Sequence, residues 1–242
     1  DDVFSWDDLP ASVVVFGPGV IGLELGQSLA RLGVRVAVLG RGGRVGPLTD
    51  PVVRSAFLDA ISTELYVDPD AHVERVTRVG DEVEVAYRAL DGSPRVERFA
   101  YALAATGRRP NVDGLGLESL GLALDATGVP VHDPRTLRIA GTNLFIAGDA
   151  ANDIPLLHEA ADEGRIAGHN AADPAGSEPG HRRAPLSVVF TDPQVAIVGG
   201  GFAKLAPGTF EAGEVSWADQ GRSRVMLKNR GHLRVYADRA TG

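Results

Sequence analysis

Three glycines near the start of the chain have the spacing of a dinucleotide-binding turn. Gly17, Gly19 and Gly22 follow the apolar run 13–16 and precede a helical pattern. In a strand-turn-helix unit the first glycine permits a sharp turn, the second lets a diphosphate approach the backbone, and the third lets the helix lie close to the strand. The amides and the dipole of the helix N-terminus then favour an anion. Because both flanks fit, we favour dinucleotide binding over an ordinary turn.

The end of the second expected strand bears on which nucleotide binds. NAD-binding units carry an acidic residue there, which grips the ribose hydroxyls. This chain has Gly40 in that place, after the strand expected at 34–39, and Arg41 and Arg44 follow. A guanidinium binds a phosphate in a bidentate fork, and an absent carboxylate removes a repulsion. The sequence therefore leans toward NADP(H) over NAD(H), with a solvated arginine loop as the alternative interpretation.

A second stretch that could hold a ligand runs from Asn143 to Ala172. Residues 144–147 are expected to form a short buried strand, Gly148 and Asp149 close it, and a helix is expected to begin near Pro155. A carboxylate at a strand end, beside a helix N-terminus, suits the hydroxyls of a sugar-like chain. A turn aspartate that caps local amides is the alternative interpretation.

Hydrophobic periodicity predicts the elements that must position these residues. The helix after the glycines is expected to run to about Leu32, where Gly33 ends it. Asp91-Gly92 is a strong hairpin signal. We expect an α/β, Rossmann-like domain with an antiparallel meander. The other elements expected in it are a helix at 50–62, a strand at 65–67 and meander segments at 73–79, 83–90 and 96–105.

The last part of the chain is expected to begin a separate β-rich unit. Residues 173–185 contain Pro, Gly, Ser and a basic triplet, which is typical of a domain boundary. Beyond it we expect strands at 186–190 and 195–198 and a hairpin of 225–228 with 233–236. The helix before the boundary is expected to bury Leu156, Ala160, Ala167 and Ala171.

Composition argues against several classes of protein. The chain has 242 residues, 44% of them apolar, and a net charge of -8 with a sequence pI near 5.2. This charge disfavours binding to nucleic acid or to an anionic membrane surface. No apolar run approaches the roughly 18 residues that span a bilayer. Cysteine is absent, which excludes a disulfide framework, thiolate metal sites and a cysteine nucleophile within this sequence, and no metal site is expected.

The ends of the sequence indicate where the protein works and how complete the chain is. The opening DDVFSWDDLP lacks the basic and apolar regions of a signal peptide. The first residue is Asp1, and the only methionine is Met226. We therefore expect a cytoplasmic protein of which this chain is one segment.

Four motifs in fixed order give the sequence a resemblance to a known family. GPGVIGLELG, ATGRRPN, FIAGDAANDIPLLHEAADEG and SVVFTDPQVAIVG resemble the flavin-dependent pyridine nucleotide-disulfide oxidoreductases, and among them most closely the dihydrolipoyl dehydrogenases. The resemblance implies an NAD(P)-binding domain at 1–109, the C-terminal part of an FAD-binding domain at 110–172, and the start of an α+β dimer-interface domain at 185–242. It also implies a homodimer.

The same resemblance assigns roles to individual residues. Glu24, whose carboxylate also suits a helix N-terminus without any ligand, would lie by the nicotinamide. Gly148 and Asp149 would bind the ribityl and phosphate region of FAD. The helix beginning near Leu157 and His158 would point its N-terminus at the flavin pyrimidine, with His158 equally suited to packing. The resemblance also places Gly17, Gly19, Gly22 and Gly107 at the pyridine nucleotide. With Val20, Ile21, Arg41 and Arg44 these complete the residues expected around it.

The departures from the family pattern limit what this segment can do alone. The family's redox-active cysteine pair and first FAD glycine motif would precede it, and a His-Pro…Glu acid/base element would follow it. We therefore expect no catalytic residue in this chain and no turnover of lipoamide by it alone. In the complete enzyme, electrons would pass from a lipoyl-type dithiol through the cysteines to FAD, and then as hydride to NAD(P)+. The alternatives are a transhydrogenase or mercuric-ion reductase of the same family, or a non-catalytic NAD(P)H-binding module.

Overall fold

The computed structural model describes residues 2–242, which form two compact units. The first unit contains the described chain up to Gly107 together with Leu186–Gly242, and the second unit is Arg108–Pro185. Asp1, where the expected first domain begins, lies outside the described residues.

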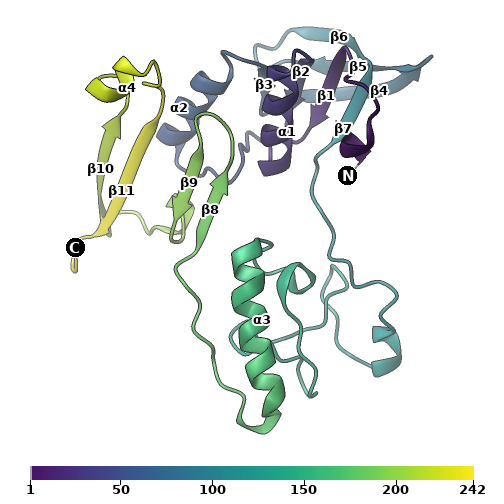
Figure 1. Cartoon of the computed structure of the whole chain (residues 1–242), viewed down its shortest axis with the longest axis vertical. Helices are drawn as coiled ribbons and strands as arrows, with labels where there is room; N and C mark the ends of the chain where they lie inside the picture. Colours follow the sequence, from purple (N-terminus) through teal and green to yellow (C-terminus); the bar gives the residue numbers. More distant parts are fainter. Residues whose placement is uncertain (1) are drawn as a thin grey trace. The chain divides into compact units, whose positions relative to one another are not determined.

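A parallel sheet of four strands organises the first unit (Figure 1). Its order is β3 (Tyr66–Asp68), β2 (Arg35–Leu39), β1 (Ser12–Phe16) and β7 (Tyr101–Ala104). All three pairings are parallel, so the carboxyl ends of the four strands share one edge. The expected α/β architecture with a Rossmann-like sheet is confirmed.

The central strands β1 and β2 are buried on both faces, whereas the edge strand β7 is largely exposed. Successive residues of a strand point to opposite sides of the sheet, so each central strand packs against both neighbouring layers. Val13 and Val15 pack with Leu23 of α1 (Val20–Arg31) and Phe57 of α2 (Pro51–Ile61). Val14, on the other face, packs against the meander. The meander strands are β4 (His72–Val79), β5 (Glu82–Arg88) and β6 (Pro94–Phe99), and all their pairings are antiparallel.

The segment expected as one strand at 96–105 is in fact two strands in two sheets. β6 pairs antiparallel with β5, whereas β7 pairs parallel with β1. The change occurs at Ala100, whose amide donates to Ser12 Oγ at 3.0 Å. The apolar run 99–105 continues across this change without a turn residue, so the sequence pattern merged the two strands.

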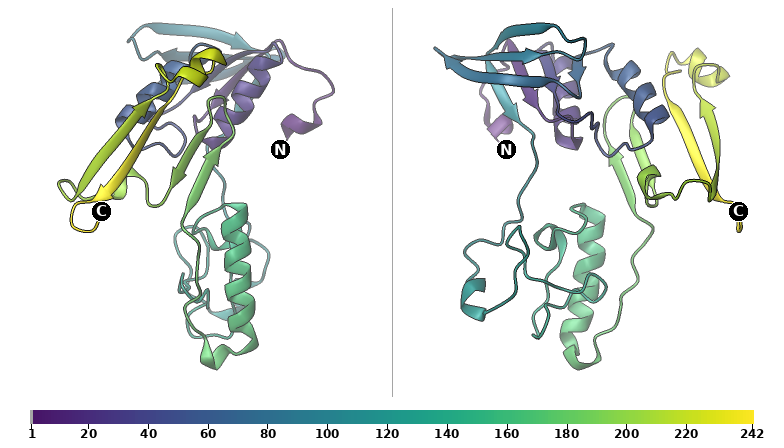
Figure 2. Two further views of the ribbon diagram at one scale, coloured as in Figure 1. Left: turned by 60° about the vertical axis from the view of Figure 1, so that its left-hand side comes forward. Right: turned by 180° about the vertical axis from the view of Figure 1, so that it is seen from behind.

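The C-terminal part of the first unit contains two hairpins. β8 (Leu186–Val189) pairs with β9 (Val195–Val198), and β10 (Phe210–Ser216) pairs with β11 (His232–Asp238). Figure 2 shows the β10–β11 hairpin beside α2, which it contacts. The expected hairpin of 225–228 with 233–236 is wrong: Val225 ends the short helix α4 (Gly221–Val225), and Leu227 has φ 55°. The apolar side chains of 225–227 are exposed, so their hydrophobicity does not indicate a strand here.

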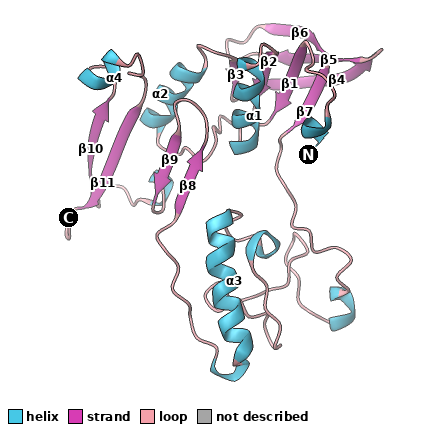
Figure 3. Ribbon diagram, viewed as in Figure 1, coloured by secondary structure: helices cyan, strands magenta, loops and turns pink. Residues whose placement is uncertain are grey.

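The second unit is built mostly from loops around one helix, α3 (Leu157–Ala172) (Figure 3). The strand expected at 144–147 does not form, because only Phe145 makes a ladder pair, with Arg138. A strand needs a neighbour that takes its backbone groups along its length. Here the segment 137–139 takes only two of them, the Leu144 carbonyl at 2.9 Å and the Ile146 amide at 3.0 Å. The helix begins two residues later than the Pro155 of the expectation.

The buried side of α3 differs from the expected apolar one. Ala171 is exposed, and the deeply buried residues are mainly polar: Glu159, Asp162, Glu163 and Asn170, with Ile166 and Ala167. The alanines of this segment are spaced as on one side of a helix, but ion pairs with the connector that follows the helix determine which side is buried.

Among residues 2–242, no helix combines the length and the hydropathy that crossing a bilayer requires.

Candidate nucleotide-binding site

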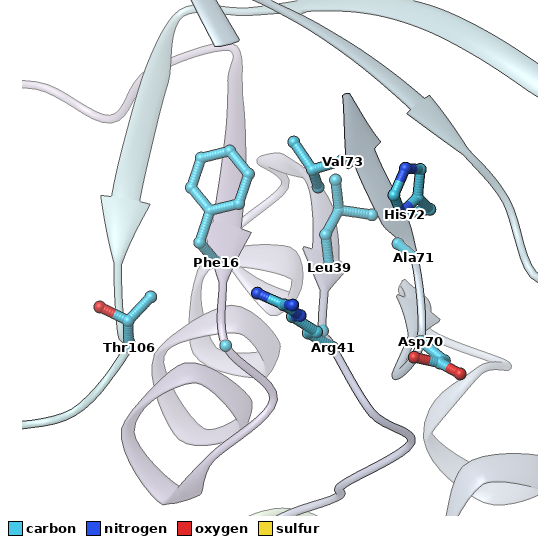
Figure 4. A pocket seen from close by; sticks show the side chains of 10 residues that line it. Phe16, Leu39, Arg41, Asp70, Ala71, His72, Val73 and Thr106 are labelled. Atoms are coloured by element: carbon cyan, nitrogen blue, oxygen red, sulfur yellow. The ribbon is translucent and has the colours of Figure 1, made fainter. Parts of the chain in front are cut away.

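A pocket of about 510 Å³ lies at the carboxyl edge of the parallel sheet (Figure 4). Ligands of open α/β sheets bind outside this edge, where loops leave the strands. The pocket walls come from the ends of β1 and β2, from the segment after β7 and from the turn between β3 and β4. The residues that line it are Phe16, Gly17, Leu39, Gly40, Arg41, Asp70, Ala71, His72, Val73 and Thr106.

The first and third glycines of the turn have no room for a side chain. Gly17 has φ +108°, and a Cβ on it would lie 2.5 Å from the carbonyl oxygen of Ala105. A Cβ on Gly22 would lie 1.9 Å from the carbonyl oxygen of Gly17 and 3.3 Å from the Cβ of Ala105. Both glycines therefore fix the close approach of the turn, the start of α1 and the segment after β7.

The second glycine differs, because nothing in the protein occupies the space beside it. Gly19 is the N-cap of α1 with φ -76°, and a Cβ on it would meet no atom within 4 Å. The amides of the first helical turn, which begins with Val20 and Ile21, have no acceptor within the helix. Gly19 thus borders an open space at the positive end of a helix, which suits an anionic diphosphate.

The crowding around Gly40 explains why no acidic residue stands at the end of β2. A Cβ there would lie 2.5 Å from the carbonyl oxygen of Pro69 and 2.6 Å from Pro18 Cγ. The amide of Gly40 also donates to the carbonyl of Asp68 at 2.7 Å. The adjacent β3–β4 turn therefore excludes every side chain, a carboxylate included, from position 40.

The two arginines that follow Gly40 are placed differently. Arg41 extends into the pocket between Phe16 and Asp70, as Figure 4 shows. Arg44 is exposed and lies outside the pocket lining. Neither arginine makes an ion pair with another described residue, so the guanidinium of Arg41 is available to a ligand phosphate. Thr106 lines the pocket, whereas Gly107 (φ +121°) lies just beyond the lining.

Two polar pocket residues, Asp70 and His72, were not singled out from the sequence. They follow β3, which pairs with β2 at the edge of the sheet. The expected strand at 65–67 gave the signal that could have found them, because the loops after adjacent parallel strands share one edge.

Glu24 has a protein partner within the first unit. Its Oε1 accepts the amide of Phe190 at 2.8 Å. One turn further along α1, Gln27 donates to the carbonyl of Asp192 at 2.8 Å and accepts the Asp192 amide at 2.7 Å. This face of α1 thus binds the backbone of the β8–β9 turn, and Glu24 helps to hold that turn.

The four residues expected at a flavin lie in the second unit. Gly148 (φ +71°) begins a 3-10 turn, and its amide donates to Glu163 Oε2 at 2.6 Å. Asp149 follows it and is exposed. Leu157, the first residue of α3, is 89% exposed. His158 has a buried Nε2 without a hydrogen-bond partner among the described residues.

A buried carboxylate of α3, Glu163, holds the Gly148 turn in place. Glu163 accepts hydrogen bonds from Arg182 Nη2 at 2.7 Å and from the Gly148 amide. Burial raises the pKa of Glu163. Arg183 pairs with Asp162 at 3.0 Å and lowers the pKa of that carboxyl. No cluster of three potential metal ligands occurs among residues 2–242.

Comparisons with curated proteins find relatives over nearly the whole chain. Dihydrolipoyl dehydrogenase of Pseudomonas aeruginosa is 34% identical over 245 residues, covering 96% of this chain and 49% of the relative. NAD(P)H dehydrogenase (quinone) of Mycobacterium tuberculosis is 30% identical over 246 residues, covering 99% of this chain and 48% of the relative. The chain therefore spans about half the length of the curated relatives it matches.

Solved structures show the same fold. The crystal structure of LpdA from Mycobacterium tuberculosis superposes with a TM-score of 0.81 at 29% identity, covering 99% of this chain and 52% of that chain. The flavoprotein disulfide reductase RclA from Escherichia coli superposes with a TM-score of 0.83 at 23% identity, covering 99% and 54%, which supports the fold alone. The family match, Pyridine nucleotide-disulphide oxidoreductase, covers residues 1–164. The chain thus belongs to the pyridine nucleotide-disulphide oxidoreductases, a family of FAD- and NAD(P)-dependent enzymes, as its motifs predicted.

Proposed function

We propose that this chain is the pyridine nucleotide platform of a flavin-dependent disulfide oxidoreductase similar to dihydrolipoyl dehydrogenase. The observation that carries the proposal is the open space beside Gly19, at the N-terminus of α1 and next to the pocket of the sheet edge. The diphosphate of NAD(P) would bind the amides of residues 19–22, and its adenosine half would fill the pocket. Glu24 would lie toward the nicotinamide half.

In this proposal the second unit supplies part of an FAD site. Asp149 is exposed beside a turn that Glu163 holds by the Gly148 amide, so its carboxylate can accept hydroxyls of a ribityl chain. The uncovered first turn of α3, with Leu157 and His158, would stabilise negative charge on a reduced ring. FAD, when bound, supplies the two-electron transfer between a dithiol and NAD(P)+. The sequence has no cysteine, so the dithiol chemistry would use residues outside it.

The domain partition 1–109, 110–172 and 185–242 belongs to the same proposal, with a homodimer formed through the last part. The hairpin β10–β11 supports it by an uncovered apolar face. Val215 lies directly opposite Leu233, and they are 49% and 45% exposed. A second copy, or further strands of the same domain, would cover this face.

The electron partner is proposed to be a lipoyl-type dithiol, because several relatives of about 30% identity are dihydrolipoyl dehydrogenases. A quinone is a second candidate, because a relative of 30% identity is an NAD(P)H dehydrogenase (quinone). Transhydrogenase and mercuric-ion reductase activities, and nucleotide binding without catalysis, stay as alternatives. Assays of the flavoprotein with dihydrolipoamide and with a quinone would separate the first two.

Gly19→Ala tests the nucleotide site directly. A methyl group at this position meets no protein atom, so the fold should persist with a stability change within about 1 kcal/mol. The methyl would occupy the space proposed for the diphosphate, so the dissociation constants of NADH and NADPH should rise by about tenfold or more. Isothermal titration calorimetry measures both constants.

Gly213→Ala is the matched control for Gly19→Ala. It lies in β10 of the same unit, and its Cβ would also meet no atom within 4 Å. Its nucleotide affinities should equal those of the unaltered protein. Unchanged affinities in Gly19→Ala would contradict the proposed diphosphate site.

Arg41→Glu tests the proposed lean toward NADP(H). A charge-assisted hydrogen bond contributes about 1.5–3 kcal/mol, so NADPH binding should weaken by about tenfold or more, whereas NADH should change much less. Arg44→Glu, outside the pocket lining, should have a smaller effect. Equal affinities of the unaltered protein for NADH and NADPH would contradict the lean.

A further inference from the structure

The nucleotide pocket contains a carboxylate that comes from the β3–β4 turn rather than from β2. This residue is Asp70, and its Oδ1 accepts the Gly42 amide at 2.6 Å. In the same turn, the carbonyl oxygen of Pro69 accepts a hydrogen bond from the Gly43 amide at 3.1 Å. The turn that carries Asp70 therefore also holds the backbone of the loop that carries Arg41.

The nearby Asp68 shows what a purely structural carboxylate looks like in this turn. Asp68 is 1% exposed. Its Oδ1 accepts the Asp70 amide at 3.0 Å, and its Oδ2 accepts the Leu90 amide at 2.7 Å. Asp70, in contrast, is exposed in the pocket wall and has one oxygen, Oδ2, without a hydrogen-bond partner among the described residues.

The turn around Pro69 accounts both for the missing acid at position 40 and for the carboxylate of Asp70 in the pocket. Pro69 blocks every side chain at Gly40, and the residue next to Pro69 puts a carboxylate into the same pocket. A carboxylate in this region accepts hydrogen bonds from ribose hydroxyls and repels a phosphate in their place. Arg41 has the opposite preference.

We infer that Asp70 is the specificity-determining carboxylate of the nucleotide pocket. Its free oxygen accepts a hydroxyl of the adenine ribose, and its charge opposes a 2′-phosphate on that ribose. Cofactor choice then depends on the balance between Asp70 and Arg41 across the pocket. The inference rests on the proposed nucleotide site and adds a residue that acts against the arginine.

Asp70→Asn removes the charge and keeps the amide contact, because the Asn side-chain oxygen can still accept from Gly42. The affinity for NADPH should rise several-fold and that for NADH should fall several-fold, so the ratio of the two dissociation constants should move by about tenfold toward NADPH. Asp70→Glu keeps the charge and should keep the ratio within about threefold of the unaltered protein. Calorimetric titration of both nucleotides gives the ratio for each variant.

Smaller probes locate the effect in the adenosine half. Adenosine 2′,5′-bisphosphate carries the 2′-phosphate and 5′-AMP lacks it, so Asp70→Asn should favour the first over the second by the same factor. Asp81→Asn is the matched control, because Asp81 is fully exposed in the β4–β5 turn and should leave every ratio unchanged. Far-UV circular dichroism checks that each variant is folded.

The outcomes separate this inference from the proposed function. If the unaltered protein binds both nucleotides and Asp70→Asn leaves the ratio unchanged, the role of Asp70 is wrong and the nucleotide site stands. If the unaltered protein binds neither nucleotide, the proposed site is wrong and the inference falls with it. A ratio that moves toward NADH in Asp70→Asn would also overturn the inference.

Discussion

Replacing Gly22 with alanine is expected to lower the free energy of unfolding of the first unit by about 4 kcal/mol or more. The new Cβ would lie 1.9 Å from the carbonyl oxygen of Gly17. That oxygen is backbone, so no change of rotamer can relieve the overlap, and α1 would have to move away from the glycine turn. Domains are stable by only about 5–15 kcal/mol, so the variant should be close to unfolding.

Tryptophan fluorescence during urea titration measures this loss in the right unit. The sequence has two tryptophans, Trp6 and Trp217, and both belong to the first unit. The ring of Trp6 lies 5.0 Å from that of Tyr101 in β7, so its emission reports on the parallel sheet.

Two other helical glycines give a graded control series for Gly22→Ala. A Cβ on Gly26 would lie 3.1 Å from Val38 Cγ2, a side-chain atom, so a small shift should accommodate it at a cost of about 1 kcal/mol. A Cβ on Gly168 of α3 would meet nothing within 4 Å, and alanine there should stabilise its helix by up to about 1 kcal/mol. Because α3 belongs to the second unit, the tryptophan transition of the first unit should not move in this variant. Equal stabilities of the Gly22 and Gly26 variants would contradict the steric argument.

The glycine turn was predictable because its determinants are local. The strand at 12–16, the sharp turn at Gly17 and the helix that ends before Gly33 follow one another without a break. Each step depends on residues a few positions apart, so the sequence pattern and the structure agree. The family followed from the same local motifs taken in order.

The features that escaped prediction depend on partners far away in the chain. Ala100 separates two strands because Ser12 and β1 lie beside it. The hairpin partner of β11 is β10 rather than the closer apolar segment 225–228, part of which is helical. Periodicity describes one segment at a time and contains no information about its neighbour.

The same limit applies to the site. Arg41 was found because it directly follows an expected strand. Asp70 is 29 positions further along and reaches the pocket only because β3 lies next to β2. The absence of an acid at Gly40 was read as a preference for phosphate, whereas the structure gives it a steric cause in Pro69.

Asp50→Ala is expected to release the β10–β11 hairpin from α2 at a cost of about 3 kcal/mol. Asp50 is 4% exposed, and its Oδ1 caps α2 by accepting the amides of Val52 and Val53 at 2.8 and 3.1 Å. Its Oδ2 accepts Arg234 Nη1 at 2.8 Å and the hydroxyl of Tyr236, both from β11. Alanine removes the cap and the buried partner of Arg234, and leaves this half-buried guanidinium with only the exposed carboxylate of Glu214 as a partner among the described residues.

Urea titration distinguishes release of the hairpin from unfolding of the sheet. The Trp217 amide donates to the Gly231 carbonyl at 3.1 Å, so Trp217 reports on the hairpin and Trp6 on the sheet. Single Trp→Phe variants separate the two signals, which should coincide in the unaltered protein and split in Asp50→Ala, with Trp217 changing at lower urea. Glu211→Ala in β10 is the control: its ion pair with Arg239 is largely exposed and contributes less than about 1 kcal/mol. A single shared transition in Asp50→Ala would refute the local role of this contact.

The same contact predicts the pH range in which the hairpin is held. Burial alone would raise the pKa of Asp50, but hydrogen bonds from Tyr236, from the two capping amides and from Arg234 outweigh it and lower this pKa. Folding therefore favours the ionised carboxylate. Its stabilising contribution, complete above about pH 4, should be lost as the pH falls further.

Burial and the Asp50 carboxylate raise the pKa of Tyr236 to about 12. Folding thus favours the neutral phenol, whose contribution should be lost as the pH rises from about 10 toward 12. Tyr236→Phe should abolish the alkaline loss and keep the acidic one, because Asp50 would still pair with Arg234. Asp50→Ala should abolish the acidic loss and only reduce the alkaline one, because burial also raises the pKa of Tyr236.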